Sequence, residues 1–261
     1  MMVVDITLSL ISLKLHNENC IIKGRRRQKL YKYHTKWKYN MYIVEGNIGV
    51  GKSTFLNLLK NGCSKIETIQ EPVSTWDKNV SGESVLGNFY KNPTRWAYTI
   101  ETLAMIYRTR DYAKEQKNAN PNRVMERSVY SGHYCFAYNS LKSGFLNSAE
   151  WAIYQKWVDF LLRDQCKPPL GFIYLKSTPE TCFQRVKKRN RASEKNLTIE
   201  TLKKIHEFHE RLLVQKKDIF EELKNTPVLI LNCNKNFLEN DMVMHEKTNK
   251  VLRFFKETQR L

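Results

Sequence analysis

Several features that mark common classes of protein are missing from this 261-residue chain. No segment approaches the roughly 20 apolar residues that a membrane-spanning helix needs. The six cysteines are widely scattered without a Cys-x-x-Cys pair, which argues against a zinc site or a disulfide framework and favours a reducing compartment such as the cytoplasm. No internal repeat or low-complexity tract is found. A membrane protein, a disulfide-stapled domain and a repeat array are therefore not expected.

Acidic residues are in short supply. The chain has 44 lysines and arginines against 26 aspartates and glutamates, a formal net charge of +18 at pH 7. Apolar residues make up 41 % of it, enough for a hydrophobic core, so wholesale disorder is excluded. The positive surplus suits a polyanionic ligand. A nucleotide-binding cleft explains part of it, and nucleic acid is not expected as a partner because no aromatic and basic platform is found beyond residue 40.

Residues 1–40 differ from the rest of the chain in charge. They hold nine basic and two acidic residues, and residues 21–40 contain no acid. Two interpretations stay open, a disordered basic tail and a mitochondrial presequence. Asp5, Glu18 and the lack of a clear amphipathic helix favour the tail. We predict a basic N-terminal extension over residues 1–40 and one folded domain over residues 41–261, cytoplasmic unless the extension acts as a presequence.

The most specific motif is a phosphate-binding loop. It consists of Gly46, Asn47, Ile48, Gly49, Val50, Gly51, Lys52, Ser53 and Thr54. A strand-like segment precedes it, and the helical pattern after it stops at Asn61-Gly62, a candidate C-cap. In such a loop backbone N–H groups and the helix dipole bind phosphate oxygens, the lysine reaches the β- and γ-phosphates, and the serine hydroxyl binds Mg²⁺. The motif predicts binding of a nucleoside triphosphate.

Strand-like and helix-like segments alternate along the folded domain. Strands are predicted at residues 41–45, 65–69, 123–125, 170–175 and 227–231. One helix is predicted from about Thr94 to Glu115. Another is predicted to begin at Asn147, which forms a capping box with Glu150. Further helices are predicted to begin at Pro179 and after the last strand. On the first predicted helix an apolar stripe is formed by Trp96, Ile100, Leu103 and Ile106. The alternation predicts an α/β fold, a P-loop NTPase-type parallel sheet flanked by helices on both faces.

Charged side chains follow the predicted strands, at the edge where open α/β sheets bind their ligands. Glu71 could accept a proton from an attacking hydroxyl. Glu126 could hold Mg²⁺, and Arg127 could steady a transferring phosphoryl group. A dense basic cluster over residues 185–191 predicts an arginine-rich lid over the triphosphate. The alternative is that these charged side chains have no catalytic role and are simply exposed to solvent, at strand ends and on one face of a helix.

Four motifs in order make the chain resemble the deoxyribonucleoside kinase family, which includes deoxycytidine, deoxyguanosine and mitochondrial thymidine kinases. They are Ile43-Val44-Glu45 with the phosphate loop, Glu71-Pro72-Val73 with Trp76, Glu126-Arg127-Ser128-Val129-Tyr130-Ser131, and Arg189-x-Arg191-x-x-Glu194. The resemblance implies an enzyme of nucleotide salvage that transfers the γ-phosphate of ATP, with Mg²⁺, to the 5′-hydroxyl of a 2′-deoxynucleoside. The family is commonly dimeric, so a homodimer is expected, and an aromatic-rich helix over residues 151–162 could supply its interface. Packing in the core explains its aromatic residues equally well.

The resemblance also implies a role for each matching residue. Glu71 resembles the general base, Arg127 the arginine beside it, and Ser53 and Glu126 the metal-binding pair. Tyr90 and Glu194 resemble the pair that grips the 3′-hydroxyl, and Trp76 and Phe136 would line the base pocket. Arg185 and Phe237 resemble the residues that sandwich the adenine of ATP. Together with Lys52, the lid residues Arg189 and Arg191 would surround the phosphates.

The preferred nucleobase stays open. Glu101 stands where the family usually places a glutamine, and a carboxylate, which only accepts hydrogen bonds, suits the N1–H and N2–H donors of guanine. The alternative is that Glu101 pairs with a cation, for which Arg108, two turns along the helix, is the candidate. Arg108 matches the deoxycytidine type of member, whereas Gly132 replaces the aspartate of that type and matches the small residue of the thymidine type.

Two other functions are kept as alternatives. A nucleoside monophosphate kinase, such as a thymidylate kinase, shares the loop and lid but must bind an acceptor phosphate and needs no proton acceptor at Glu71. A non-catalytic nucleotide- or nucleic-acid-binding protein would use the basic segment from Lys23 to Lys38. The second is disfavoured because the catalytic positions retain usable chemistry.

Overall fold

The structure is a computed structural model, which describes residues 41–73, 84–163, 165–235 and 241–259. Trp76 and Phe237, expected in the base pocket and at the adenine of ATP, lie outside the described residues, as does the N-terminal extension. In the part of the chain that is described, no helix combines the length and the apolar character that crossing a membrane requires.

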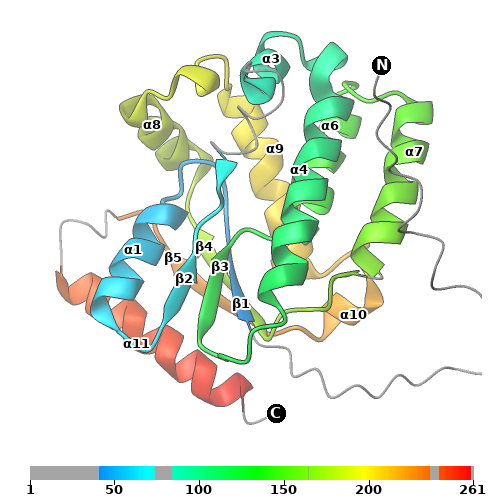
Figure 1. The fold of residues 1–261 in the computed structure, drawn as a ribbon. Coiled ribbons are helices and arrows are strands. Elements are labelled where there is room, and N and C mark those ends of the chain that lie inside the picture. The colour runs from blue at the N-terminus through cyan, green and yellow to red at the C-terminus, as the bar shows by residue number, and fades with distance from the viewer. Residues whose placement is uncertain (1–40, 74–83, 164, 236–240, 260–261) are drawn as a thin grey trace, which may run out of the picture. The chain divides into compact units, whose positions relative to one another are not determined.

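Five parallel strands form one sheet in the order β2-β3-β1-β4-β5 (Figure 1). The strands are β1 (Met41–Glu45), β2 (Glu67–Ile69), β3 (Arg123–Glu126), β4 (Gly171–Lys176) and β5 (Val228–Asn232). β1 is central, and its Val44 lies beside Glu126 of β3. Because all strands run in one direction, the segments that follow β1, β2 and β3 emerge at the same edge of the sheet.

Helices connect the strands. The longer ones are α1 (Lys52–Gly62), α4 (Pro93–Glu115), α7 (Ser148–Val158), α8 (Pro179–Arg189), α9 (Ile199–His209) and α11 (Asp241–Thr258). The shorter ones are α3 (Val85–Lys91), α5 (Val129–Ser131), α6 (Tyr138–Lys142), α10 (Glu221–Lys224) and the 3₁₀ turn Ala192–Glu194. Single π-helical stretches extend α5, α7 and α9, at Gly132–Ala137, Asp159–Arg163 and Glu210–Gln215.

Successive side chains of β1 enter two different hydrophobic cores. Tyr42 and Val44 pack into a core shared with α1 and α11, whereas Met41 and Ile43 pack into one shared with α4 and α7. Since neighbouring residues of a strand point to opposite faces, helices must cover both faces of the sheet. Figure 1 shows this arrangement, with α1 and α11 on one face and α4 and α7 on the other. The predicted α/β fold is confirmed.

Most predicted element boundaries agree with the structure to within a few residues. The capping box of α7 is present, since the Asn147 side chain accepts from the Glu150 N–H and the Glu150 carboxylate accepts from the Asn147 N–H. The predicted cap at Gly62 is wrong. That glycine is the last residue of α1, and the helix is closed by Cys63, whose N–H donates to the Leu59 carbonyl at 3.1 Å.

The apolar stripe predicted on α4 is also wrong in part. Ile106 is 47 % exposed, while the same helix buries Glu101 and Thr109 together with Ala104 and Met105. A helix on the surface of an all-apolar core would turn its carboxylates outward. Helix α4 turns one inward because its inner face borders a polar site.

Candidate active site

The phosphate loop follows β1 and leads directly into α1. Gly49 and Gly51 adopt φ angles of 81° and 101°, in the left-handed region that favours glycine. A Cβ atom at Gly49 would lie only 2.5 Å from the Cys182 carbonyl oxygen in α8, so no larger residue fits there. The glycines therefore allow the loop to close tightly at the N-terminus of α1, where backbone N–H groups and the helix dipole attract anions.

Lys52 starts α1 with its side chain buried beneath the loop. Its Nζ atom donates to the carbonyl oxygens of Gly46 at 3.2 Å and Asn47 at 3.1 Å. Burial, together with the nearby Arg127 guanidinium, lowers the pKa of Lys52 to about 8. A negatively charged phosphate at this position would favour the ammonium form, so the loop holds a cation placed to bind one.

Ser53 and Glu126 bring two oxygen donors together beside the loop. The Ser53 hydroxyl, in the first turn of α1, lies 3.1 Å from Oε1 and 3.0 Å from Oε2 of Glu126, the last residue of β3. Within the described ranges no group of three His, Cys, Asp or Glu side chains could hold a metal. A cation here would need water or phosphate oxygens as further ligands. Mg²⁺ is usually bound in this way, so the pair fits Mg²⁺.

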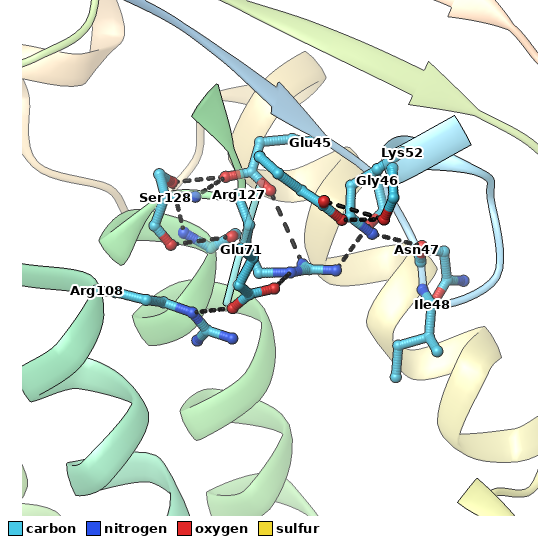
Figure 2. A network of polar contacts seen from close by, with 12 residues as sticks. Glu45, Gly46, Asn47, Ile48, Lys52, Glu71, Arg108, Arg127 and Ser128 are labelled. Atoms are coloured by element: carbon cyan, nitrogen blue, oxygen red, sulfur yellow. Dashed lines mark hydrogen bonds and ion pairs between the residues drawn. The ribbon is translucent and has the colours of Figure 1, made fainter. Parts of the chain in front are cut away.

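Glu71, which follows β2, lies between two arginines (Figure 2). Arg108 of α4 donates through Nε to Glu71 Oε1 at 2.7 Å, and Nε of Arg127 lies 3.5 Å from Oε2. Burial alone would raise the pKa of the Glu71 carboxyl, but the Arg108 and Arg127 guanidiniums outweigh burial and hold that pKa below its usual value. Glu71 is therefore an ionised carboxylate that faces the loop region.

Arg127 follows β3 in an unusual backbone conformation. Its φ is 63°, a conformation that costs a non-glycine residue of order 1–3 kcal/mol. Residues strained in this way are concentrated at functional sites. Its N–H donates to the Val44 carbonyl at 2.9 Å, and its Nη2 donates to the Gly46 carbonyl at 3.3 Å. The guanidinium carbon lies 4.5 Å from the centre of the Phe136 ring. These contacts fix Arg127 between the loop, Glu71 and the predicted base-pocket residue Phe136.

Glu101 is buried on the inner face of α4. Its Oε1 accepts from the Ser140 hydroxyl at 2.8 Å, and burial raises its pKa to about 7, against the opposing effects of Ser140 and Arg108. Among the described residues no ion pair joins Glu101 to a cation, because Arg108 turns to Glu71 instead. The predicted alternative, an ion pair between Glu101 and Arg108, is therefore not found in the described part of the chain.

Tyr90 and Glu194, the residues expected at the 3′-hydroxyl, lie near each other. Burial, followed by the Glu194 carboxylate, raises the pKa of the Tyr90 phenol. Glu194 accepts from Arg189 Nη2 at 2.6 Å and from Arg191 Nη1 at 3.3 Å. The expected lid arginines and the expected sugar-binding carboxylate are thus one ion-paired group.

Arg185 of α8 bridges two segments that flank the loop. Its Nη1 donates to the Val50 carbonyl at 3.2 Å, and its Nη2 donates to the carbonyl oxygens of Asn234 and Lys235 at 3.3 and 3.4 Å. These contacts place its guanidinium beside the phosphate loop. The site is thereby extended toward the segment that follows β5.

Three buried residues of the site did not emerge as candidates from the sequence. Glu45, at the end of β1, accepts from the Ser128 N–H at 2.8 Å and from the Ser128 hydroxyl at 2.6 Å, and His209 lies against it. An acid at the end of an otherwise apolar strand was the available signal for Glu45. His209 belongs to His206-x-x-His209-Glu210, which resembles the helix that follows the lid in the family, but the sequence assigned it no role. Only the tertiary fold brings His209 and Ser140 to the site.

A parallel sheet whose central strand enters a phosphate loop, with carboxylates and arginines at the neighbouring strand ends, defines a P-loop phosphotransferase. Residues 42–256 match the model of the family described as deoxynucleoside kinase. The chain belongs to the deoxynucleoside kinase family.

Individual relatives agree. The chain is 39 % identical to deoxycytidine kinase 2 of Gallus gallus over 226 residues, 78 % of this chain and 85 % of the relative. It is 36 % identical to the mitochondrial deoxyguanosine kinase of Xenopus laevis over 236 residues (81 % and 88 %). It is 35 % identical to the mitochondrial thymidine kinase 2 of Homo sapiens over 203 residues (78 % and 74 %). The prediction of an ATP-dependent deoxynucleoside kinase is confirmed.

Replacing Arg108 with methionine should lower the free energy of unfolding by about 3–5 kcal/mol near pH 7, because it leaves a buried carboxylate without its closest counter-charge. The loss should shrink as the pH falls. In the wild type the pKa of Glu71 lies below 4.5, so its ion pair stabilises the fold above pH 4.5 and this stabilisation is lost as the pH falls through the folded-state pKa. In the variant burial dominates, the pKa of Glu71 rises, and protonation relieves the buried charge at higher pH.

Urea unfolding between about pH 4.5 and pH 8 measures this dependence. Arg110→Met is the matched control, since Arg110 lies on the same helix with a side chain that is 60 % exposed. Its effect should stay below about 1 kcal/mol at every pH. A constant loss for Arg108→Met across this range would show that Arg108 does not govern the ionisation of Glu71.

Proposed function

We propose that Glu71 is the general base of this kinase, with Arg127 and Lys52 stabilising the charge of the transferring phosphoryl group. The observation that carries the proposal is the meeting of an ionised carboxylate, an arginine and the phosphate loop at one edge of the sheet (Figure 2). Phosphoryl transfer requires mainly that its groups be positioned and its charge be stabilised. Residues on three separate strand ends supply both.

In the proposed reaction the 5′ oxygen of the deoxynucleoside forms a bond to the γ-phosphorus of ATP. The bond between that phosphorus and the oxygen shared with the β-phosphate breaks, and ADP leaves. The hydroxyl proton passes to the Glu71 carboxylate, which Arg108 and Arg127 keep ionised and ready to accept it. Lys52 and Arg127 lie where negative charge would accumulate on the phosphoryl oxygens.

The remaining groups are assigned to ATP and the sugar. Ser53 and Glu126 would hold Mg²⁺, which when bound supplies positive charge to the β- and γ-phosphates. The adenine would lie against Arg185, under a lid that carries Arg189 and Arg191. On the acceptor side, Tyr90 and Glu194 would bind the 3′-hydroxyl, while Phe136 would line the base pocket.

Glu71→Gln should lower kcat by about 10²- to 10⁴-fold, the contribution typical of a general base, with the KM for ATP nearly unchanged. Steady-state phosphate transfer to each of the four deoxynucleosides measures the effect. Glu67→Gln is the matched control, because Glu67 lies on β2 and pairs with Arg123, away from the loop. Turnover in Glu71→Gln equal to that of the wild type would rule out Glu71 as the base.

For the acceptor we propose deoxyguanosine as the preferred substrate, read by Glu101. The Glu101 carboxyl is buried without a cation partner among the described residues, and Ser140 fixes one of its oxygens. A carboxylate held in this way accepts hydrogen bonds and donates none, which matches the adjacent N1–H and N2–H donors of guanine. Below its pKa of about 7 the same group offers one donor and one acceptor, as an amide does.

Glu101→Gln should lower the ratio of kcat/KM for deoxyguanosine to kcat/KM for deoxycytidine by roughly 10- to 100-fold at pH 8, the range expected of a bidentate base contact. Near pH 6 the wild-type carboxyl is protonated, so wild type and variant should converge. The wild-type ratio should rise as the pH passes through about 7, and the ratio of the variant should not.

A substrate panel at several pH values measures these ratios. Glu115→Gln, at the far end of the same helix, is the control and should leave them unchanged. A wild type that prefers deoxythymidine or deoxycytidine at pH 8, with no change on substitution, would contradict the assignment of guanine to Glu101.

The protein is further proposed to be a homodimer that uses α7 and the π-helical stretch after it. Ile153, Trp157 and Phe160 are 51 %, 43 % and 58 % exposed, and their spacing places them on one face. Helix α4 packs against α7 and exposes Ile106. Large apolar side chains gathered in this way mark association surfaces. A two-fold axis would bring the same patch of two subunits together.

Combining Trp157→Lys with Phe160→Lys should convert the dimer to a monomer, because like charges in the interface core would be desolvated without partners. Sedimentation velocity measures the change in mass. Val214→Lys is the control, since Val214 is an exposed apolar residue outside this patch. A wild type that sediments as a monomer at micromolar concentration would contradict the proposal.

A further inference from the structure

Three buried polar atoms gather at the end of β1, around the carboxylate of Glu45. They are Oε2 of Glu45, Nη1 of Arg127 and Nε2 of His209, and none has a hydrogen-bond partner among the described residues. Oε2 of Glu45 lies 3.8 Å from Arg127 Nη1 and 3.9 Å from His209 Nε2. Both separations exceed a hydrogen bond, and the Glu45 and His209 side chains are fully buried. Buried polar atoms left unpaired are rare and costly.

The donors and acceptors of this cluster follow from its other contacts. Nδ1 of His209 lies 2.8 Å from the Ile205 carbonyl, which can only accept, so Nδ1 carries the proton and Nε2 presents a lone pair. Burial, followed by the positive charge of Arg127, lowers the pKa of His209 and keeps the ring neutral. Oε2 of Glu45 is a second acceptor, since Ser128 uses only Oε1, and Nη1 of Arg127 is a donor.

We propose that one buried water molecule binds between these three atoms and that, with it, Glu45 and His209 act as positioning residues for Arg127. The water accepts from Arg127 Nη1 and donates to Glu45 Oε2 and His209 Nε2, so each of its two protons and all three protein atoms are satisfied. Three polar partners are the usual number for a buried water. Separations of 3.8 and 3.9 Å are short enough for both atoms of each pair to bind the same molecule.

The consequence concerns the orientation of Arg127. Its backbone is held at a φ of 63°, a conformation that persists only where the surrounding contacts enforce it. Figure 2 shows Arg127 lying between Glu45 on one side and Glu71 on the other. Through the water, Glu45 and His209 hold Nη1 of Arg127 in place, which keeps its Nε directed at Glu71. This part of the inference rests on the role proposed above for Arg127.

A pair of substitutions at His209 tests the proposal. His209→Gln keeps an acceptor oxygen near the position of Nε2, whereas His209→Leu keeps similar volume without one. Misplacing a catalytic group by about 1 Å costs on the order of 100-fold, so kcat of His209→Leu should fall by about 10- to 100-fold with the KM for ATP and deoxynucleoside unchanged. His209→Gln should restore kcat to within about threefold of the wild type.

Activity is expressed per folded molecule, counted by ATP titration, so that partial unfolding does not imitate a loss of kcat. His133→Phe is the control, because His133 is a half-buried histidine that stacks on Trp151 outside the cluster. The kcat of this variant should not change. A crystal structure of the wild type at about 1.5 Å should show one water within hydrogen-bond distance of all three atoms. The structure of His209→Leu should lack it.

Two outcomes would overturn the inference. One is a wild-type crystal structure in which Glu45 contacts Arg127 or His209 directly with no water between them. The other is an equal loss of kcat in His209→Gln and His209→Leu, which indicates a purely structural role. If Glu71→Gln loses activity while His209→Leu does not, the proposed base stands and the positioning role falls. If Arg127→Met leaves kcat unchanged, the catalytic role proposed for Arg127 is wrong. Whether the water is bound is then tested by the wild-type crystal structure alone.

Discussion

The arrangement of the site depends on the buried guanidinium of Arg127. It faces Glu71 after β2, Glu45 at the end of β1 and the Gly46 carbonyl in the phosphate loop, so one side chain ties three strand ends together. Such a group is stable only while its partners stay in place, because removing one leaves an uncompensated buried charge. The strained backbone of Arg127 adds to this requirement. The three strand ends that form the site are therefore linked through the Arg127 guanidinium.

The surroundings shift the pKa values of two carboxyl groups of the site in opposite directions. Glu71 lies against two arginines and is held ionised, whereas Glu101 has a hydroxyl partner and burial raises its pKa to about 7. Buried glutamates are not ionised by default, so the difference is set by where the arginines lie. Separating the pKa values of two like groups is a general way to assign them different chemical tasks.

The sequence was sufficient for the fold and for the local parts of the site. Strand and helix periodicity predicted the sheet, and because parallel strands end at a common edge, Glu71, Glu126 and Arg127 could be placed together without coordinates. Which partner each side chain chooses could not be predicted. Of the acids in the site, Glu101 is the nearest to Arg108 in sequence. Arg108 nevertheless pairs with Glu71, 37 residues away. Side-chain partners of this kind follow from tertiary packing, which periodicity does not encode.

Gly132 lies beside the guanidinium of Arg108. A Cβ atom at Gly132 would lie 2.9 Å from Nη1 of Arg108, so any larger residue there would displace the guanidinium, and an aspartate would attract it. With glycine at this position Arg108 stays paired with Glu71, which it helps to keep ionised, and no ion pair joins it to Glu101 in the described part of the chain. If Glu101 reads the base as proposed above, it does so without an ion-paired arginine, because Arg108 is engaged by Glu71 and Gly132 leaves the space for that engagement.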